Sequence, residues 1–283
     1  MIIIADSGST KTNWLIAGHD GNIKKIHTSG LNPNFLSSED ISMLIRNEIL
    51  PYAGHDEKAE IYFYGSGCSG FFLCNKVKEA IERIYTGAFI EVNSDLLGAA
   101  RALLGRSEGI VCILGTGSNS CLYDGLEIAA NIPPLGFILG DEGSGAYLGK
   151  RLLSDYLKGI MPDTIKQKFS QQYRADKELV IEKVYRGEFP NKYIASFVVF
   201  LKDNISMLYC STLVKDAFKD FINRNVRFYD GYKRMKISFT GSIAWHFRHI
   251  LKEVLNDHGL LIGEILKEPS DRIMDYHLSE QNQ

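Results

Sequence analysis

The sequence IIIADSGSTKT at residues 2–12 is the strongest indication of the fold, because an apolar run leads directly into Asp6 and a glycine turn. A β-branched run of this kind predicts a buried strand. Two more strands are predicted at residues 14–17 and 23–28, and His19-Asp20-Gly21-Asn22 has the composition of the hairpin turn that joins them. The chain therefore opens with a β-meander.

A second meander is predicted from the sequence IVCILGTGSN at residues 110–119 and the strands that follow it at 121–123 and 127–130. Aligning Gly8 with Gly117, 109 residues later, places Asp-Ser-Gly-Ser-Thr over Gly-Thr-Gly-Ser-Asn, and each motif follows an apolar strand. This repeat indicates that the chain is internally duplicated.

The segments around the two meanders alternate between helical periodicity and short apolar runs. After the second meander the chain is rich in helix from 143 to 226, with breaks at Pro162 and Pro190. The other predicted elements are helices near 38–50, 77–84 and 96–104, and strands at 61–64, 88–92 and 236–240. This pattern fits an α/β fold in which helices cover a mixed sheet in each half.

The composition excludes several classes of protein. The chain has 283 residues, of which 45% are hydrophobic. Its formal net charge is −2, so it has no overall electrostatic field that would attract nucleic acid or an anionic membrane. Its five cysteines contain no CxxC pair, which argues against a disulfide framework or a zinc ribbon. No apolar run approaches the ~18 residues that cross a bilayer. We expect a cytoplasmic protein without nucleic-acid or membrane partners.

Three glycine turns, each after an apolar strand, predict a polyphosphate-binding site. Glycine lets the backbone approach a ligand closely, and hydroxyl side chains and amide groups donate to phosphate oxygens. Any one of these turns could be an ordinary tight hairpin, but three in related contexts favour a phosphate clamp. The candidate nucleotide-binding residues are Gly8, Ser9, Thr10, Lys11, Thr12, Gly115, Thr116, Gly117, Ser118, Gly241 and Ser242.

Carboxylates accompany these turns. Asp6 ends a strand, where aspartate is disfavoured, so it is a candidate ligand of Mg²⁺, directly or through water; the alternative is a turn-forming aspartate. Asp95 lies at a predicted helix start, either as a plain N-cap or as the base that accepts a substrate hydroxyl proton. Asp141 and Glu142 lie in the glycine-rich segment 135–145. Glycine on both sides favours a backbone bent around a ligand, with carboxylates on substrate hydroxyls or metal-bound water; the alternative is that one of them caps the following helix.

The sequence GSGCSG at residues 65–70 offers a competing interpretation. It matches the dinucleotide-binding pattern GxGxxG, follows a predicted strand and precedes a helix, and Glu91 ends the next strand. The pattern alone is weak, and it leaves the other glycine turns unexplained.

Taken together, the repeated meander, the three turns and Gly140-Asp141-Glu142-Gly143-Ser144 resemble the sugar kinase, heat-shock ATPase and actin superfamily, and within it the N-acetylglucosamine kinase and BadF/BadG/BcrA/BcrD-type ATPase family. The resemblance implies two ribonuclease-H-like lobes, each with a mixed five-stranded sheet, around a central cleft. The lobes would span 1–107 and 108–283, and the last helix, about 268–283, could pack back on the first lobe.

The resemblance also implies roles for individual residues. Residues 6–12 would be the first phosphate loop, 115–119 the second, and 240–244 the adenosine loop. Asp95 would be the base, and Asp6 and Asp141 would hold Mg²⁺. Sugar contacts are implied for Asn32, Ser66, Gly67, Asp95, Thr116, Gly117 and Asp141.

Two departures from the family pattern concern the substrate pocket and the first loop. Pro133-Pro134-Leu135-Gly136 stands where aminosugar kinases of the family commonly show Gly-Gly-Trp-Gly, and Ser7 replaces the usual glycine. No close cysteine pair matches the iron–sulfur ligands of the related dehydratase activators, which argues against a redox activator.

The expected function is an ATP-dependent, Mg²⁺-requiring phosphorylation of a sugar hydroxyl, with N-acetylglucosamine or a related amino sugar as acceptor. The alternatives are an ATPase or nucleotide-gated sensor without sugar kinase activity, and a dinucleotide-dependent oxidoreductase that uses the GSGCSG turn. A homodimer is one option for the assembly.

Overall fold

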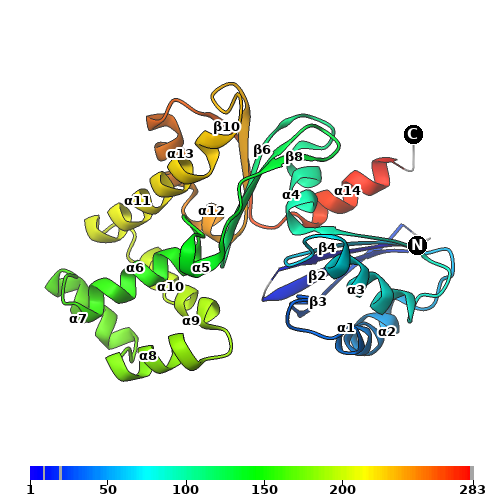
Figure 1. Ribbon diagram of the computed structural model, residues 1–283, viewed down its shortest axis with the longest axis horizontal. Helices are drawn as coiled ribbons and strands as arrows, with labels where there is room; N and C mark the ends of the chain where they lie inside the picture. The colour runs from blue at the N-terminus through cyan, green and yellow to red at the C-terminus, as the bar shows by residue number, and fades with distance from the viewer. Residues whose placement is uncertain (9, 19–20, 281–283) are drawn as a thin grey trace. The chain divides into compact units, whose positions relative to one another are not determined.

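The computed structural model describes residues 1–8, 10–18 and 21–280. The predicted nucleotide contact at Ser9 and part of the predicted hairpin turn, His19 and Asp20, lie outside these residues. The chain divides into two compact units (Figure 1). Unit 1 consists of residues 1–107, 125–127 and the final segment from Glu268, and unit 2 consists of Glu108–Asp124 and Ile128–Lys267.

The sheet of unit 1 has five strands in the order β3-β2-β1-β4-β5. The first three form the predicted antiparallel meander, and β4 and β5 continue the sheet parallel to β1. The strands are β1 (Ile2–Ser7), β2 (Lys11–Ala17), β3 (Ile23–Ser29), β4 (Glu60–Gly65) and β5 (Phe89–Ser94). The carboxyl ends of the three parallel strands therefore meet at one edge, where ligands bind in open α/β sheets.

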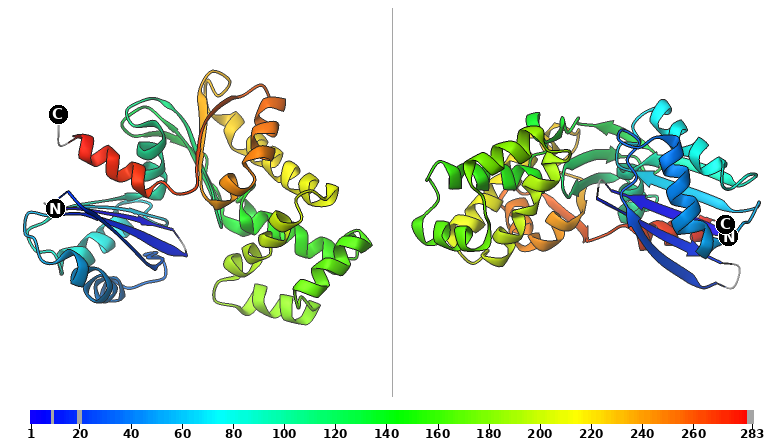
Figure 2. Two further views of the ribbon diagram at one scale, coloured as in Figure 1. Left: turned by 180° about the vertical axis from the view of Figure 1, so that it is seen from behind. Right: turned by 90° about the horizontal axis from the view of Figure 1, so that it is seen from below.

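Alternating side chains of this sheet supply two separate cores. Ile3, Ala5 and Phe63 face the layer of α1 (Ser38–Leu44), α2 (Leu50–Ala53) and α3 (Phe71–Glu82), with a π-helical turn Ile45–Ile49 between α1 and α2. Ile4 and Tyr64 face α4 (Asp95–Leu104) and α14 (Ser270–Glu280). In Figure 2 the red helix α14 lies beside α4, and the structure packs it against both α4 and β1.

The sheet of unit 2 repeats the topology of unit 1. Its order is β8-β7-β6-β9-β10, with β6, β7 and β8 antiparallel and β9 and β10 parallel to β6. The strands are β6 (Gly109–Leu114), β7 (Ser118–Tyr123), β8 (Ile128–Asn131), β9 (Lys236–Thr240) and β10 (Leu261–Leu266). The duplication inferred from the sequence is confirmed, and each unit has the mixed five-stranded sheet that was predicted.

The residue alignment of the two repeats needs a correction. Four residues separate the paired Ser7 and Thr12 in the first hairpin, whereas three separate Leu114 and Ser118 in the second. Gly8 follows the end of β1 as Gly115 follows the end of β6, and each donates its N–H across its own turn. β1 and β6 therefore match with an offset of 107 residues and β2 and β7 with an offset of 106, so the predicted equivalence of Gly8 and Gly117 is wrong.

Helices pack against the sheet of unit 2, and their apolar faces form its core with one face of the strands. Pro162 immediately precedes α7 and Pro190 begins α9, as the predicted helix breaks require. The helices are α5 (Gly136–Leu139), α6 (Gly145–Leu157), α7 (Asp163–Gln172), α8 (Lys177–Arg186), α9 (Pro190–Ser196), α10 (Val198–Asp203), α11 (Leu208–Arg224), α12 (Ser242–His246) and α13 (Arg248–Asp257). Among the described residues, no helix is both long and apolar enough to span a membrane.

The dinucleotide-binding alternative does not agree with this fold. A dinucleotide-binding domain needs a mostly parallel sheet that opens with the GxGxxG strand, whereas β4 follows an antiparallel meander. The N–H groups of Cys68 and Ser69 donate to Gly65 and Gly67 inside the same loop, so they are not free for a pyrophosphate. That alternative is therefore wrong.

Candidate active site

A row of polar side chains crosses the first three strands of unit 1 near the carboxyl end of β1. The strand register places Asp6, Asn13 and His27 directly opposite one another. Asn13 hydrogen-bonds the Asp6 carboxylate, and its Oδ1 lies 2.9 Å from Nδ1 of His27. Because Ile4 and Leu15 on the same face are fully buried, the row marks the point where the apolar core ends and the polar edge begins.

The first glycine turn lies at this edge. Gly8 closes the turn by donating its N–H to the carbonyl of Lys11 at 3.0 Å, and Thr10 and Lys11 are exposed. Lys11 extends from the first residue of β2, and its Nζ lies 2.7 Å from Oε1 of Glu268. Thr12 is different: its hydroxyl is buried and donates to the carbonyl of Ser29, so it stabilises the sheet and does not face a ligand.

Asp95 is the first residue of α4 and follows directly from β5. Ser94 is the N-cap and accepts from the N–H of Leu97, so the predicted N-cap role belongs to Ser94 and leaves the Asp95 carboxylate for another purpose. Burial raises the pKa of Asp95 to about 6, opposed by backbone N–H groups at the helix start. A carboxylate of this kind is ionised at neutral pH, and its pKa is close enough to neutrality for general-base catalysis.

Asp6 and Asp95 lie close enough for their charges to interact. Burial is the largest cause that raises the pKa of Asp6 to about 7; repulsion by Asp95 and Glu268 adds to it, while Asn13 and Lys11 oppose it. Unit 1 therefore concentrates more negative charge at this edge than its own cations neutralise. A divalent cation would relieve that repulsion, and its preferred ligands are carboxylate and phosphate oxygens.

The predicted sugar contacts of unit 1 lie on loops beside Asp95. The register pairs Gly65, the last residue of β4, with Ser94, so the loop of Ser66 and Gly67 leaves the sheet next to the start of α4. Gly67 has a φ of +89°, and a Cβ there would lie 2.4 Å from Oδ1 of Asn32. The structure thus brings Asn32, Ser66 and Gly67 to the same edge as the carboxylates.

In unit 2, the second and third glycine turns contact each other. Gly241 has a φ of +112°, and a Cβ there would lie 2.3 Å from the carbonyl oxygen of Leu114 and 3.3 Å from the nitrogen of Gly115. Ser242, which follows, is exposed and begins α12. The start of α6 lies at the same place, because Gly145 and Ala146 donate their N–H groups to the carbonyls of Gly115 and Thr116.

Asp141 packs against the second turn. Its Oδ1 accepts from the N–H of Ser118 at 3.1 Å, and a Cβ on Gly117 would lie 3.1 Å from its Oδ2, so glycine makes room for the carboxylate. Asp141 has a φ of 56°, an uncommon value that suggests a functional constraint. Burial raises its pKa to about 6, and the charge of Glu142 adds to the rise.

The proline-containing segment that departs from the family pattern supports Asp141 directly. The N–H of Asp141 donates to the carbonyl of Pro134 at 2.9 Å, and Leu135 also has a positive φ, 60°. Among the described residues, Leu135 and Asp141 are the two non-glycine positions with positive φ. Strain is therefore concentrated around this carboxylate.

The predicted residues thus form one cluster in each unit. The cluster at the edge of unit 1 consists of Asp6, Gly8, Thr10, Lys11, Asn32, Ser66, Gly67 and Asp95. The cluster in unit 2 consists of Gly115, Thr116, Gly117, Ser118, Asp141, Gly241 and Ser242. Within the described part of the chain, no group of three or more His, Cys, Asp or Glu side chains is placed to hold a metal by itself. The donor set fits a cation that shares its ligands with phosphate, held by Asp6 or Asp141.

Sequence reasoning missed Asn13, His27 and Glu268. The alternation of Lys11, Asn13 and Leu15 on β2, read against the hairpin register, could have revealed that Asn13 faces Asp6. Glu268 lies 257 positions from Lys11, and no local pattern connects them.

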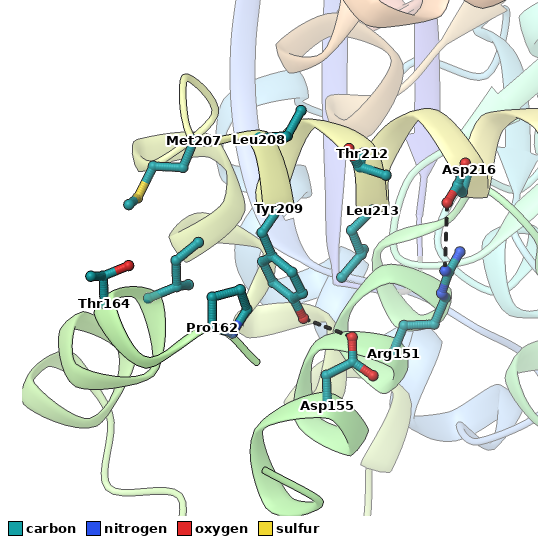
Figure 3. A pocket seen from close by; sticks show the side chains of 11 residues that line it. Arg151, Asp155, Pro162, Thr164, Met207, Leu208, Tyr209, Thr212, Leu213 and Asp216 are labelled. Atoms are coloured by element: carbon teal, nitrogen blue, oxygen red, sulfur yellow. Dashed lines mark hydrogen bonds and ion pairs between the residues drawn. The ribbon is translucent and has the colours of Figure 1, made fainter. Parts of the chain in front are cut away.

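A separate cavity of about 550 Å³ opens on unit 2 among α6, α7 and α11 (Figure 3). Tyr209 donates to Asp155 at 2.8 Å across one wall, and Arg151 lies 3.9 Å from Asp216 at another. The glycine turns and Asp141 do not line it, so we do not assign it to the active site.

Comparison with known proteins identifies the fold and the family. The chain is 43% identical to a Porphyromonas gingivalis protein provisionally assigned as an N-acetylglucosamine kinase, over 99% of this chain and 100% of that one, with a TM-score of 0.94. A Chromobacterium violaceum protein with the same provisional assignment is 18% identical (97% and 98% covered, TM-score 0.75). A Streptomyces griseus ROK family glucokinase, solved with glucose and AMPPNP, is 15% identical (99% of each chain covered, TM-score 0.56).

The last two similarities concern the fold alone, which is that of the actin-like sugar kinases. Neither the protein-family models nor the curated proteins give a match. The first similarity extends over both complete chains, and on that basis the chain belongs to the sugar kinase family of the Porphyromonas gingivalis protein.

Proposed function

We propose that the protein transfers the γ-phosphoryl group of ATP to a hydroxyl of N-acetylglucosamine or a closely related amino sugar. The observation that carries the proposal is the carboxylate pair of unit 1, Asp6 and Asp95, set beside a glycine turn and a lysine. Phosphoryl transfer needs positioning, neutralisation of charge and a carboxylate that orients the attacking hydroxyl. In this scheme the glycine turn positions the phosphates, Asp95 orients the hydroxyl, and Lys11 together with bound Mg²⁺ would neutralise the charge.

Asp95 acts as the base in this scheme. Its carboxylate orients the acceptor hydroxyl and takes its proton as the sugar oxygen forms a bond to the γ-phosphorus and the bond from that phosphorus to the β–γ bridging oxygen breaks. ADP leaves with the electron pair of the broken bond. The position of Asp95 at the start of α4 favours the ionised form that this step needs.

The other residues bind and orient. The phosphates of ATP are assigned to Gly8, Thr10, Lys11 and Gly115–Ser118. Its nucleoside is assigned to Gly241 and Ser242, and the sugar to Asn32, Ser66 and Gly67. When bound, Mg²⁺ would neutralise charge on the phosphates, with Asp6 and Asp141 as its protein ligands, directly or through water. The TM-score of 0.56 with a glucokinase that binds glucose and AMPPNP supports ATP as the donor.

The acceptor is proposed from the relative of 43% identity, whose provisional assignment is N-acetylglucosamine kinase. Sugar-dependent ADP release over a panel of hexoses and N-acetylhexosamines tests the proposal. We expect the fastest release with N-acetylglucosamine or a related amino sugar and slow release without sugar. ADP release that no sugar accelerates would indicate an ATPase instead.

Asp95→Asn tests the mechanism in the same assay. We expect the sugar-dependent rate to fall by about 10²-fold or more, while the affinity for AMPPNP stays nearly unchanged. Asp275→Asn, at an exposed position of α14, is the matched control and should behave as the wild type. Equal activity of Asp95→Asn and wild type would remove Asp95 from the role of base.

A further inference from the structure

The lysine of the first glycine turn is held by a carboxylate from the other end of the chain. Nζ of Lys11 lies 2.7 Å from Oε1 of Glu268, and Nδ2 of Asn13 donates to Oε2 of the same residue at 3.4 Å. Lys11 and Asn13 are two positions apart on β2 and therefore project from the same face. Both oxygens of Glu268 are thus engaged by the strand that follows the turn.

Glu268 is anchored to unit 1 by the helix that follows it. It is the first residue of the segment that returns the chain from unit 2, which ends at Lys267. The N–H of Ile273 donates to the carbonyl of Pro269, and Ile273 and Met274 are buried against β1 and α4. The carboxylate is therefore presented to Lys11 from a packed element and not from a loose tail.

This contact places a negative charge where the proposed function requires a phosphate. An ammonium group binds a carboxylate and a phosphate through the same donors. Side chains of both partners are substantially exposed, 51% for Lys11 and 37% for Glu268, so the pair is weak enough for a ligand to exchange it. Glu268 also repels the neighbouring Asp6, which shows that its charge is felt at this edge.

We propose that Glu268 is an intramolecular competitor of the nucleotide phosphates: it occupies Lys11 in the nucleotide-free protein and lowers the affinity for ATP. This inference rests on the proposed function, because it assumes that Lys11 binds phosphate. On nucleotide binding, Lys11 exchanges the carboxylate of Glu268 for a phosphate oxygen. Since an exposed ion pair is weak, the competitor tunes the affinity within a small range and does not block the site.

The test is the dissociation constant of AMPPNP, measured by calorimetry on the full chain. We expect Glu268→Gln to bind AMPPNP about two- to fivefold more tightly than the wild type, which corresponds to the strength of an exposed ion pair. Asp271→Asn is the matched control: it removes the same charge from the same segment, but Asp271 pairs with Lys25. Its affinity should stay at the wild-type value.

A double-mutant cycle shows whether the effect passes through Lys11. Lys11→Met should weaken binding, and adding Glu268→Gln to it should then change the affinity by less than the single substitution does. Any of three results would overturn the proposal that Glu268 competes with nucleotide. Glu268→Gln could bind AMPPNP no more tightly than the wild type, Asp271→Asn could gain as much affinity, or Glu268→Gln could gain the same affinity in the Lys11→Met background. Failure of the wild type to bind AMPPNP would instead overturn the proposed function, and this inference with it.

Discussion

Replacing Asp6 with asparagine should stabilise the protein at neutral and alkaline pH. The carboxyl group is shielded from solvent and lies near the negative charges of Asp95 and Glu268, so its pKa is raised from 3.8 to about 7. Between about pH 4 and pH 7 the folded protein therefore holds a proton on Asp6 that the unfolded chain has already released. Asparagine has nearly the same shape and no charge, and its amide can still hydrogen-bond with Asn13.

The sign and size of the effect follow from proton linkage. Between about pH 4 and pH 7 the unfolded state binds fewer protons than the folded state at this position, so the contribution of Asp6 to stability falls as the pH rises. A shift of about three pKa units corresponds to about 4 kcal/mol. Because residue Asp6 as a whole is only half-buried, solvent screening reduces this figure and we expect about 2–4 kcal/mol.

Urea unfolding of wild type and Asp6→Asn, in the presence of a chelator, measures this difference. The variant should match the wild type near pH 4 and exceed it by the full amount at pH 8. Asp275→Asn, which removes an exposed aspartate from α14 of the same unit, should show no such divergence. A variant that is less stable than the wild type at pH 8, or a difference that does not change with pH, would refute the reasoning.

Three further predictions concern single groups. Burial lowers the pKa of His277 to about 4, so its contribution to stability is complete above pH 6.5 and is lost as the pH falls towards 4. In unfolding experiments, His277→Gln should remove about 3 kcal/mol of this acid destabilisation. An acid dependence of stability equal to that of the wild type would contradict this. Gly241→Ala should lower the free energy of unfolding by about 3 kcal/mol or more, since its Cβ would clash with the carbonyl of Leu114. Gly159→Ala, at a φ of +70° in open space, is the control and should cost about 1 kcal/mol. Equal losses in the two variants would contradict the clash. The value of kcat/KM should fall tenfold per pH unit below about pH 6, where Asp95 of the free enzyme becomes protonated. If kcat/KM stayed constant down to pH 5 and fell only below it, Asp95 would be excluded as the titrating group.

Much of the fold was accessible from the sequence because its signals are local. An apolar run that ends in aspartate and glycine predicts a buried strand and a turn, and its repetition predicts a second sheet of the same topology. The residue alignment failed because the hairpins differ by one residue in length, and matching glycines does not detect that difference. The register of paired strands is needed to decide it.

The elements that sequence reasoning missed depend on distant contacts. β10 was not predicted because Gly263 interrupts a short, half-exposed strand. A Cβ at Gly263 would lie 2.1 Å from Oγ of Ser238, so packing against β9 requires glycine at a position where strand propensity disfavours it. Thr12 looked like a phosphate ligand because it follows the turn, but alternation turns its hydroxyl into the sheet. Glu268 could be connected with Lys11 only once the return of α14 to unit 1 was known.

The central claim is that the glycine turns bind the phosphates of ATP, and calorimetric titration with AMPPNP tests it most directly. The account predicts one site per chain whose affinity falls by about 10-fold or more in Lys11→Met of unit 1, because a charged hydrogen bond to phosphate is lost, and falls also in Gly117→Ala of unit 2. Two independent sites per chain, or a single site that either substitution leaves unchanged, would contradict it.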